Sequence, residues 1–331
     1  MSLYKHLTLK DRELILKGLS NHLSYQKIAM QIGCSKSTIS REISRNGGKE
    51  KYSIVDAQNR YQQKRKKCRK PRILSEESLR RLVIKYIVIK KWSPEQISNR
   101  LKYERKISLS YNTIYRAIYE NNLGIKLKSS KARGIALKLR HSGKSRHTKK
   151  KIDNRGRRFW NAPTIHDRPR SAQNRSRFGH WEADTVRGKT GKAALITLVD
   201  RKSRFLLAQR VEKVNSKQVC QGLIDLLKTI SPNKVLSITP DRGSEFTRYK
   251  EFGSSLGMSV YFPDPHSPHQ RGTNENTNGL LREYFPRNTD IDTMSEPEIA
   301  QVIEQLNHRP RKILGWKSPY EVFHGVSLHL I

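Results

Sequence analysis

The order of apolar runs in residues 179–290 limits the fold of this chain more than any other feature. Three short runs rich in β-branched and aromatic residues come first, at Trp181–Val186, Ala193–Val199 and Phe205–Val211. The turn residues Asp200-Arg-Lys-Ser join the last two runs. This pattern predicts three consecutive strands.

Helices and strands alternate in the rest of the same segment. Apolar residues at helical spacing precede Pro232, namely Val219, Leu223, Leu226, Leu227 and Ile230. A fourth strand is expected at Val235–Ile238 and a fifth at Met258–Phe262, with a helical stretch at Thr247–Leu256 between them and a last helix at 273–285. Three strands, helix, strand, helix, strand, helix is the order of an RNase H-like α/β core, and we expect that fold here.

Three acids occupy particular places in this pattern. Asp184 lies in the first strand, Asp241 lies where the fourth strand gives way to a turn, and Glu275 lies in the first turn of a helix that Pro286 ends. An Asp before Arg-Gly is, taken singly, usually a turn residue. The three acids together predict a site for divalent cations, which need hard oxygen ligands. The two strands that carry Asp must then be neighbours.

Other polar residues surround these acids in sequence. Asn278 and Arg282 follow Glu275 at i+3 and i+7, so one helix face carries a carboxylate, an amide and a guanidinium. Glu182 lies on the same strand face as Asp184, and we expect it to support the site or the fold rather than to bind metal. For the loop histidines we expect DNA contacts rather than metal ligation; these are His266 and His269.

The charge of the chain indicates a polyanionic partner. Lys and Arg number 67 against 29 Asp and Glu, a net charge of +38, and such an excess repels itself unless a polyanion neutralises it. Nucleic acid is the favoured partner and an acidic membrane surface is the alternative. The sequence has no apolar run near 18 residues and no signal-peptide pattern, so we expect a soluble intracellular protein.

Residues 1–48 predict a helix-turn-helix domain of three helices, with Ser24 and Ser35 as N-caps of the second and third. A small residue that permits close helix crossing, a turn glycine and an apolar return to the core follow at Ala29, Gly33 and Ile39. The third helix would present to DNA Lys36, Ser37, Ser40, Arg41 and Arg45. A plain three-helix bundle with a solvated basic face is the alternative.

A second helix-turn-helix is expected at residues 91–123, after a basic arm and a helix at 49–90. Lys64–Arg72 holds seven basic residues in nine and reads as a phosphate-contacting arm or as solvated chain, and Ser75 is expected to cap the next helix. Ser93 and Ser110 would cap the paired helices. The side chains able to face DNA are Tyr111, Asn112, Thr113 and Arg116, although mere packing helices are the alternative.

Residues 124–178 read as a basic linker and residues 291–331 as a helical extension. Gly124–His180 has 18 Lys and Arg against two acids and little apolar period, so we expect an extended chain that orders along DNA phosphates. Its segment 155–171 has aromatic and proline residues that are expected to dock onto the next domain. Its proposed contacts include Lys149, Lys150, Lys151, Arg157 and Arg158. In the extension Ser295 and Glu298 form a capping box, and Ser318 begins a short last helix. Three further cations there could touch DNA: Arg309, Arg311 and Lys312.

Five blocks of the sequence, which together span most of it, resemble the DDE transposases of bacterial insertion sequences, specifically the insertion-sequence-thirty family. The blocks are IAMQIGCSKSTISREISRN, RSRFGHWEADTV, TPDRGSEF, HSPHQRGTNENTNGLLREYF and LNHRPRKILGWKSPYEVF. The resemblance implies a catalytic triad of Asp184, Asp241 and Glu275, with Arg282 as the basic partner on the last helix. It also implies that the N-terminal part binds the terminal inverted repeats of the element. Arg242 is a departure, because Asn is commoner at this position in such enzymes.

The expected chemistry is phosphoryl transfer without a covalent enzyme intermediate. Asp184 would be shared by two Mg²⁺ ions, or Mn²⁺, while Asp241 and Glu275 each complete one site. The first reaction nicks the end of the element and the second joins that 3′-OH to target DNA. Double-stranded DNA is the expected partner, in a synaptic complex of a homodimer or higher oligomer at the bacterial nucleoid in the cytoplasm. The alternatives are a catalytically silent helix-turn-helix regulator and an RNase H-like nuclease that cuts without joining.

Overall fold

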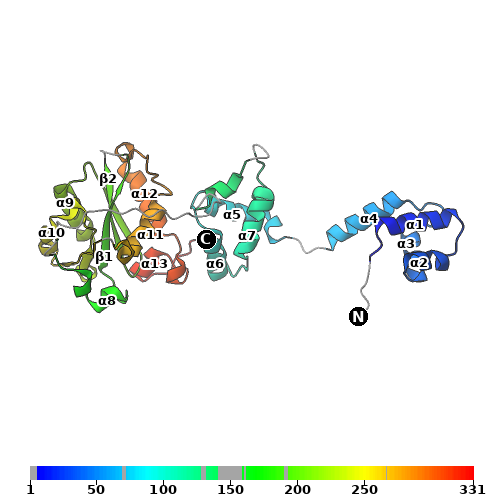
Figure 1. The fold of residues 1–331 in the computed structure, drawn as a ribbon, viewed down its shortest axis with the longest axis horizontal. Coiled ribbons are helices and arrows are strands. Elements are labelled where there is room, and N and C mark those ends of the chain that lie inside the picture. The colour runs from blue at the N-terminus through cyan, green and yellow to red at the C-terminus, as the bar shows by residue number, and fades with distance from the viewer. Residues whose placement is uncertain are drawn as a thin grey trace. The chain divides into compact units, whose positions relative to one another are not determined.

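The computed structural model divides the chain into two compact units, Met1–Ser75 and Glu76–Ile331 (Figure 1). It describes residues 6–68, 72–127, 132–140, 159, 162–189, 193–265 and 267–331. His266 and the five predicted phosphate contacts between 149 and 158 lie outside these residues. None of the described helices combines the length and the apolar character needed to cross a membrane.

The first unit begins with the predicted helix-turn-helix. Helices α1 (Leu9–Ser20), α2 (Tyr25–Ile32) and α3 (Lys36–Arg45) each start at an N-cap hydroxyl that accepts a hydrogen bond from the first turn, supplied by Thr8, Ser24 and Ser35. Gly33 ends α2 with φ 74°, a left-handed conformation that favours glycine. Ile15, Ile28, Ile39 and Ile43 are buried between the helices, so the predicted return of Ile39 to the core is confirmed.

A fourth helix, α4 (Ile54–Lys67), belongs to the same unit. Tyr52 and Ala57 are buried in its core. The buried Arg12 of α1 also donates to Glu42 Oε1 at 2.8 Å and to Gln58 Oε1 at 2.7 Å. The prediction of a basic arm outside the first domain is therefore wrong for this segment.

The second unit contains a five-stranded sheet in the order β3-β2-β1-β4-β5. Its strands are β1 (His180–Arg187), β2 (Ala194–Asp200), β3 (Leu206–Val211), β4 (Ser237–Thr239) and β5 (Ser259–Val260). The first three strands pair antiparallel, whereas β1 pairs with β4, and β4 with β5, in parallel. This is the predicted RNase H-like α/β core, and β1 and β4 are neighbours as expected.

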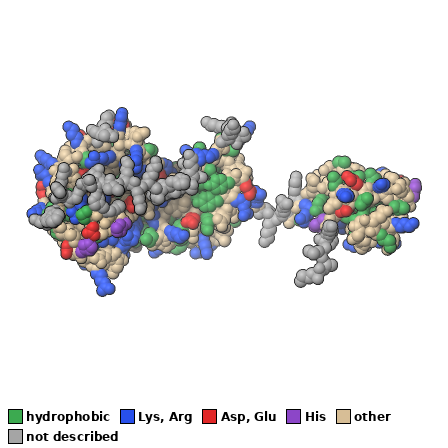
Figure 2. All heavy atoms as spheres, viewed as in Figure 1, with side chains coloured by type: hydrophobic (Ala, Val, Ile, Leu, Met, Phe, Trp, Pro, Cys, Tyr) green, Lys and Arg blue, Asp and Glu red, His purple; other side chains and the backbone are tan. Residues whose placement is uncertain are grey.

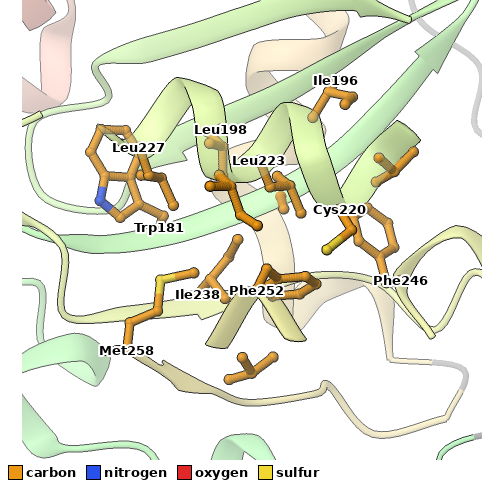
Figure 3. Close-up of a cluster of buried hydrophobic side chains, with 14 of the residues drawn as sticks. Trp181, Ile196, Leu198, Cys220, Leu223, Leu227, Ile238, Phe246, Phe252 and Met258 are labelled. Carbon is orange, nitrogen blue, oxygen red and sulfur yellow. The ribbon is translucent and has the colours of Figure 1, made fainter. Parts of the chain in front are cut away.

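Helices cover both faces of this sheet (Figure 1). On one face, α9 (Ser216–Lys228) and α10 (Tyr249–Ser255) pack on the sheet. Leu223 and Phe252 of these helices are buried in one cluster with Trp181, Leu198 and Ile238 of the strands (Figure 3). On the other face, α11 (Gly272–Leu281) and α12 (Glu296–Asn307) pack on the sheet. Leu280, Ile299 and Leu306 of these helices are buried in one cluster with Leu195 and Val199 of β2. Helix α11 ends at Leu281, whose carbonyl accepts from the amides of Tyr284 and Phe285, so the helix stops before Pro286.

A helical module of α5 (Glu77–Val88), α6 (Pro94–Arg105) and α7 (Tyr111–Asn121) precedes the sheet. The predicted caps of α6 and α7 are confirmed: Ser93 forms a capping box with Gln96, and Ser110 accepts from the amide of Asn112. The predicted cap of α5 is wrong. Ser75 lies in a 3-10 turn, and Glu76 precedes the helix without a side-chain cap.

The predicted extended linker is folded where the structure describes it. The 3-10 turn Gly134–Lys138 buries Ile135 and Ala136 and packs against α5 and α7. Further on, α8 (Arg170–Gln173) buries Ala172, and Thr164 pairs with Phe262 beside the sheet. The prediction of an extended chain is therefore wrong for 132–140 and 172–178. The expectation that 155–171 docks onto the next domain is confirmed where the structure describes it, because Phe159 and Ala162 are buried in the apolar cluster of the core.

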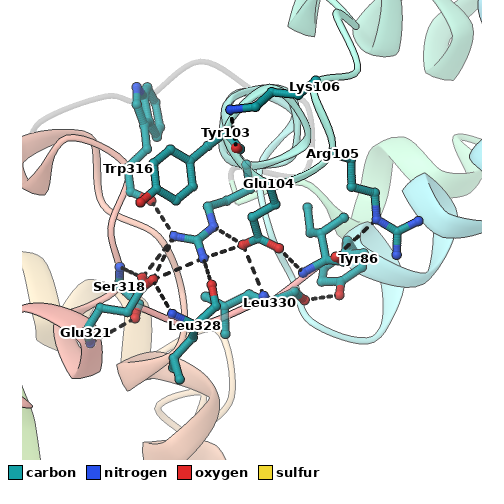
Figure 4. A network of polar contacts seen from close by, with 12 residues as sticks. Tyr86, Tyr103, Glu104, Arg105, Lys106, Trp316, Ser318, Glu321, Leu328 and Leu330 are labelled. Carbon is teal, nitrogen blue, oxygen red and sulfur yellow. Dashed lines mark hydrogen bonds and ion pairs between the residues drawn. The ribbon is translucent and has the colours of Figure 1, made fainter. Parts of the chain in front are cut away.

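The C-terminal segment joins the helical module to the core (Figure 4). The fully buried Arg100 of α6 pairs with Glu104 and with Glu321 of α13 (Pro319–His324), and its Nη2 donates to the carbonyl of Leu328 at 2.8 Å. Glu104 in turn accepts from the amides of Leu330 and Ile331. Because a buried guanidinium requires paired partners, this network fixes the module on the core.

Candidate active site

Two of the three predicted acids meet at one end of the sheet. Pairing between β1 and β4 stops at Glu182 and Thr239, and Asp184 and Asp241 each follow two residues later. Their carboxylates share one guanidinium. Arg271 Nη1 lies 3.7 Å from Asp184 Oδ2, and its Nη2 lies 3.8 Å from Asp241 Oδ2.

The Asp184 carboxylate is held by hydrogen bonds on both oxygens. Oδ1 accepts from the amide of Thr185 at 2.8 Å, and Oδ2 accepts from Asn278 Nδ2 of α11 at 2.9 Å. Burial raises the pKa of Asp184 to about 6; the guanidinium of Arg271 opposes this rise, and the charge of Asp241 adds to it. A cation beside the buried Asp184 carboxylate would therefore stabilise its charged form.

The Asp241 carboxylate is placed by a tight turn. Its Oδ1 accepts from the amide of Gly243 at 2.7 Å. A Cβ at Gly243 would lie 2.7 Å from that oxygen and 2.4 Å from Glu245 Oε2. A side chain at this position would therefore displace the Asp241 or Glu245 carboxylate.

Glu245 and Arg271 are parts of this site that the sequence did not reveal. Glu245 is buried, accepts from Thr185 Oγ1 at 3.0 Å and lies 3.4 Å from Arg187 Nη2. Its charge also raises the pKa of Asp184. Arg271 additionally donates to the carbonyl of Ala183 at 3.0 Å. A carboxylate four residues after Asp241 and a cation four before Glu275 were the only local signals.

Glu275 lies in the first turn of α11, where its side chain is exposed. In the part of the chain that the structure describes, no three His, Cys, Asp or Glu side chains are grouped closely enough to hold a metal ion. The structure thus brings Asp184 and Asp241 together and leaves Glu275 outside that pair. Asn278 faces Asp184, a contact that the helical spacing did not predict, whereas Arg282 caps α11 and donates to the carbonyl of Phe285 at 3.3 Å.

Glu182 and Arg242 have other partners. Glu182 is fully buried and ion-paired with Arg201, and its Oε2 accepts from the amide of Asn274 at 2.9 Å. It therefore fixes the start of α11 rather than facing a metal. Arg242 donates through Nε to the carbonyl of Pro263 at 2.7 Å.

The predicted DNA-facing residues lie on two helices. On α3 all five side chains are exposed, opposite the buried Ile39 and Ile43, and Arg41 Nη2 donates to Ser37 Oγ at 3.1 Å. On α7, Tyr111, Asn112 and Arg116 are exposed and Thr113 is half-buried.

The donor set fits a hard divalent cation. Asp184 and Asp241 offer carboxylate oxygens, and their side chains are 19% and 32% exposed. Glu245 adds a third negative charge nearby, and the guanidinium of Arg271 touches both aspartates. The Arg271 guanidinium, which is itself 14% exposed, therefore lies where a positive charge offsets the repulsion between the carboxylates.

Known families and proteins are similar to this chain in sequence. Residues 174–268 match the family described as an integrase core domain, and residues 4–46 match a helix-turn-helix domain family. A transposase of the insertion sequence element IS30A from Escherichia coli is 42% identical over 98% of this chain and 85% of its own length. A transposase of the element IS1086 from Cupriavidus metallidurans is 33% identical over 96% of this chain and 94% of its own length.

Two further proteins are similar over different extents. A putative integrase of Spiroplasma virus SpV1-R8A2 B is 31% identical over 97% of this chain and 99% of its own length. Among solved structures, the catalytic core domain of the integrase of BIV is 22% identical and matches with a TM-score of 0.35 over 44% of this chain and 94% of that chain.

Proposed function

Because this chain belongs to the insertion-sequence-thirty family of DDE transposases, we propose that Asp184, Asp241 and Glu275 are the acids at which its chemistry takes place. The protein is a polynucleotidyl transferase that catalyses DNA transposition. The observation that carries the proposal is the meeting of Asp184 and Asp241 on neighbouring strands around one guanidinium.

Each residue of the site has a definite task in this proposal. Asp184 and Asp241 hold the cation through carboxylate oxygens that backbone amides and Asn278 keep in place. Glu275 contributes from α11, whose start is fixed one residue earlier by the contact between Asn274 and Glu182. When bound, Mg²⁺ would activate the attacking hydroxyl and stabilise the leaving 3′ oxygen.

The DNA contacts extend the same proposal to the rest of the chain. The exposed face of α3 binds the terminal inverted repeats of the element, through Arg41 and its neighbours, and α7 makes further contacts through Tyr111, Asn112, Thr113 and Arg116. Arg282 and the basic residues between 149 and 158 contact phosphates. We place the reaction in the bacterial cytoplasm, in a synaptic complex of two or more copies.

A cleavage and joining assay tests the assignment. Asp184→Asn, Asp241→Asn and Glu275→Gln should each lower the cleavage rate by about a thousandfold or more, because each removes a charge that holds the cation. Binding of the element's ends should stay at the wild-type level. Asp225→Asn on the exposed side of α9 is the matched control and should cleave normally.

Contrary results are easy to recognise. Near-normal cleavage by Asp241→Asn refutes the assignment of that residue. If the wild-type protein cleaves but never joins, the chain acts as a nuclease. If it binds ends but shows no metal-dependent cleavage, it acts as a regulator.

A further inference from the structure

A basic cleft lies within the second unit, between the helical module and the catalytic core. Its volume is about 490 Å³. The start of α6, the first turns of α11 and residues 309–316 form its walls. We propose that this cleft binds the phosphodiester backbone of the DNA strand that reaches the active site.

Positive charge dominates the walls of the cleft. Six cations line it and one acid, Glu95, opposes them; the cations are Arg140, Arg175, Arg204, Arg309, Arg311 and Lys312. Like charges at this density repel one another strongly unless an anion lies among them. Lys and Arg side chains also appear elsewhere on the face of the second unit in Figure 2, but in the cleft they converge on one space.

Protein carboxylates neutralise only part of this charge. Arg309 Nη1 lies 2.7 Å from Glu283 Oε2, and Arg140 Nε lies 3.5 Å from Oε1 of the same glutamate. Within the described ranges, Arg311 and Lys312 have no carboxylate as an ion-pair partner, and neither has Arg175. One glutamate thus pairs with two of the arginines, and the other cations of the cleft are left for an anion from outside the protein.

In the described part of the chain, two guanidinium groups of the cleft each keep one buried nitrogen without an acceptor, although Arg311 Nη2 does donate to the carbonyl of Leu306 at 3.0 Å. The Nε atoms of Arg175 and Arg311 are buried, and neither has a hydrogen-bond partner among the described residues. Burial, together with the charges of Arg309 and Arg140, lowers the pKa of Arg311 to about 9. For Arg204, burial and the charge of Arg175 lower the pKa to about 10. A phosphate group would supply the missing negative charge, and its oxygens can accept two parallel hydrogen bonds from one guanidinium.

The position of the cleft relates it to the chemistry. Asn276 and Thr277 of α11 line the cleft, and the next residue, Asn278, donates to Asp184. A strand in the cleft would therefore follow α11 toward the two aspartates. This inference depends on the proposed function for the identity of that strand, but the affinity of the cleft for phosphates can be measured without catalysis.

Salt dependence of DNA binding by the full chain tests the inference, with a random-sequence duplex as probe. Each lost phosphate contact reduces the slope of log K against log salt by ~0.9. Arg175→Gln with Lys312→Gln should therefore flatten the slope by about 1.8. Lys217→Gln with Lys228→Gln removes the same charge from the exposed side of α9, on the other face of the sheet, and should leave the slope nearly unchanged.

The two sets of outcomes are separable. Equal flattening by both double variants, or none by the cleft variant, overturns the inference. If the cleft double variant does not fold, Lys312→Gln alone decides, since this exposed lysine should account for about 0.9 of the slope. Binding of Mn²⁺ by the cleft variants should equal that of the wild type. If the catalytic assignment is wrong, the aspartate variants will cleave normally. That result would not change the flattening of the salt slope that is expected for the cleft variants.

Discussion

Protonation of His180 should destabilise the strands that carry the two aspartates. His180 begins β1 and is 3% exposed. Its Nδ1 lies 2.8 Å from the hydroxyl of Ser237 on β4, and its Nε2 lies 3.0 Å from that of Ser171. Burial, and then the charges of Arg201, Arg168 and Arg177, lower the pKa of His180 from 6.5 to about 4.

The sign and size of the effect follow from these two pKa values. Between pH 6.5 and 4 the unfolded chain binds the proton and the folded chain does not, so stability falls as the pH falls through this window. At pH 5 the difference corresponds to about 2 kcal/mol relative to pH 8, from 1.36 kcal/mol for each pKa unit. A histidine that stays neutral when buried thus acts against folding in acid.

Urea unfolding at pH 8 and pH 5 measures this loss. All four tryptophans lie after residue 75, so their fluorescence follows the second unit alone. The wild type should lose about 2 kcal/mol more than His180→Asn between the two pH values, because Asn does not titrate and the other histidines are common to both proteins. Equal losses in the two proteins would refute the reasoning.

Two further predictions concern buried and shared charges. Arg271→Gln removes the cation that lies 3.7 and 3.8 Å from the two aspartates, so Mn²⁺ should bind about tenfold more tightly. The control is Arg242→Gln, which removes a guanidinium bonded to the carbonyl of Pro263, and unchanged Mn²⁺ affinity in Arg271→Gln would contradict the prediction. Glu321→Ala leaves the buried Arg100 with one acidic partner fewer and should lower the stability of the second unit by about 3 kcal/mol; limited proteolysis should then cut near the helical module, and an unchanged urea midpoint would contradict this.

Local signals in the sequence were sufficient for the five strands and for most of the longer helices. Cap hydroxyls such as Ser35 and Ser93 and the apolar periods of the strands act over a few residues. The neighbouring position of β1 and β4 was predicted because the two aspartates must meet, whereas their parallel pairing was not predicted. Helix α4 was missed because it is polar over most of its length and packs through Ala57.

Contacts between distant residues were not predictable in the same way. Arg271 reaches Asp184 and Ala183 across 87 and 88 residues, and Glu245 reaches Thr185 across 60. Neither residue has a periodicity or cap signal that points to its partner. The C-terminal network around Arg100 likewise joins side chains that only the folded core brings together.

Mn²⁺ binding, followed by electron paramagnetic resonance, tests the central claim most directly. The claim is that Asp184 and Asp241 hold the catalytic cation, and the measurement requires neither DNA nor turnover. The wild type and Asp225→Asn should bind Mn²⁺ with the same affinity, and Asp184→Asn and Asp241→Asn should each bind it at least about a hundredfold more weakly, because each loses a charged oxygen ligand. Wild-type affinity in Asp184→Asn would contradict the account.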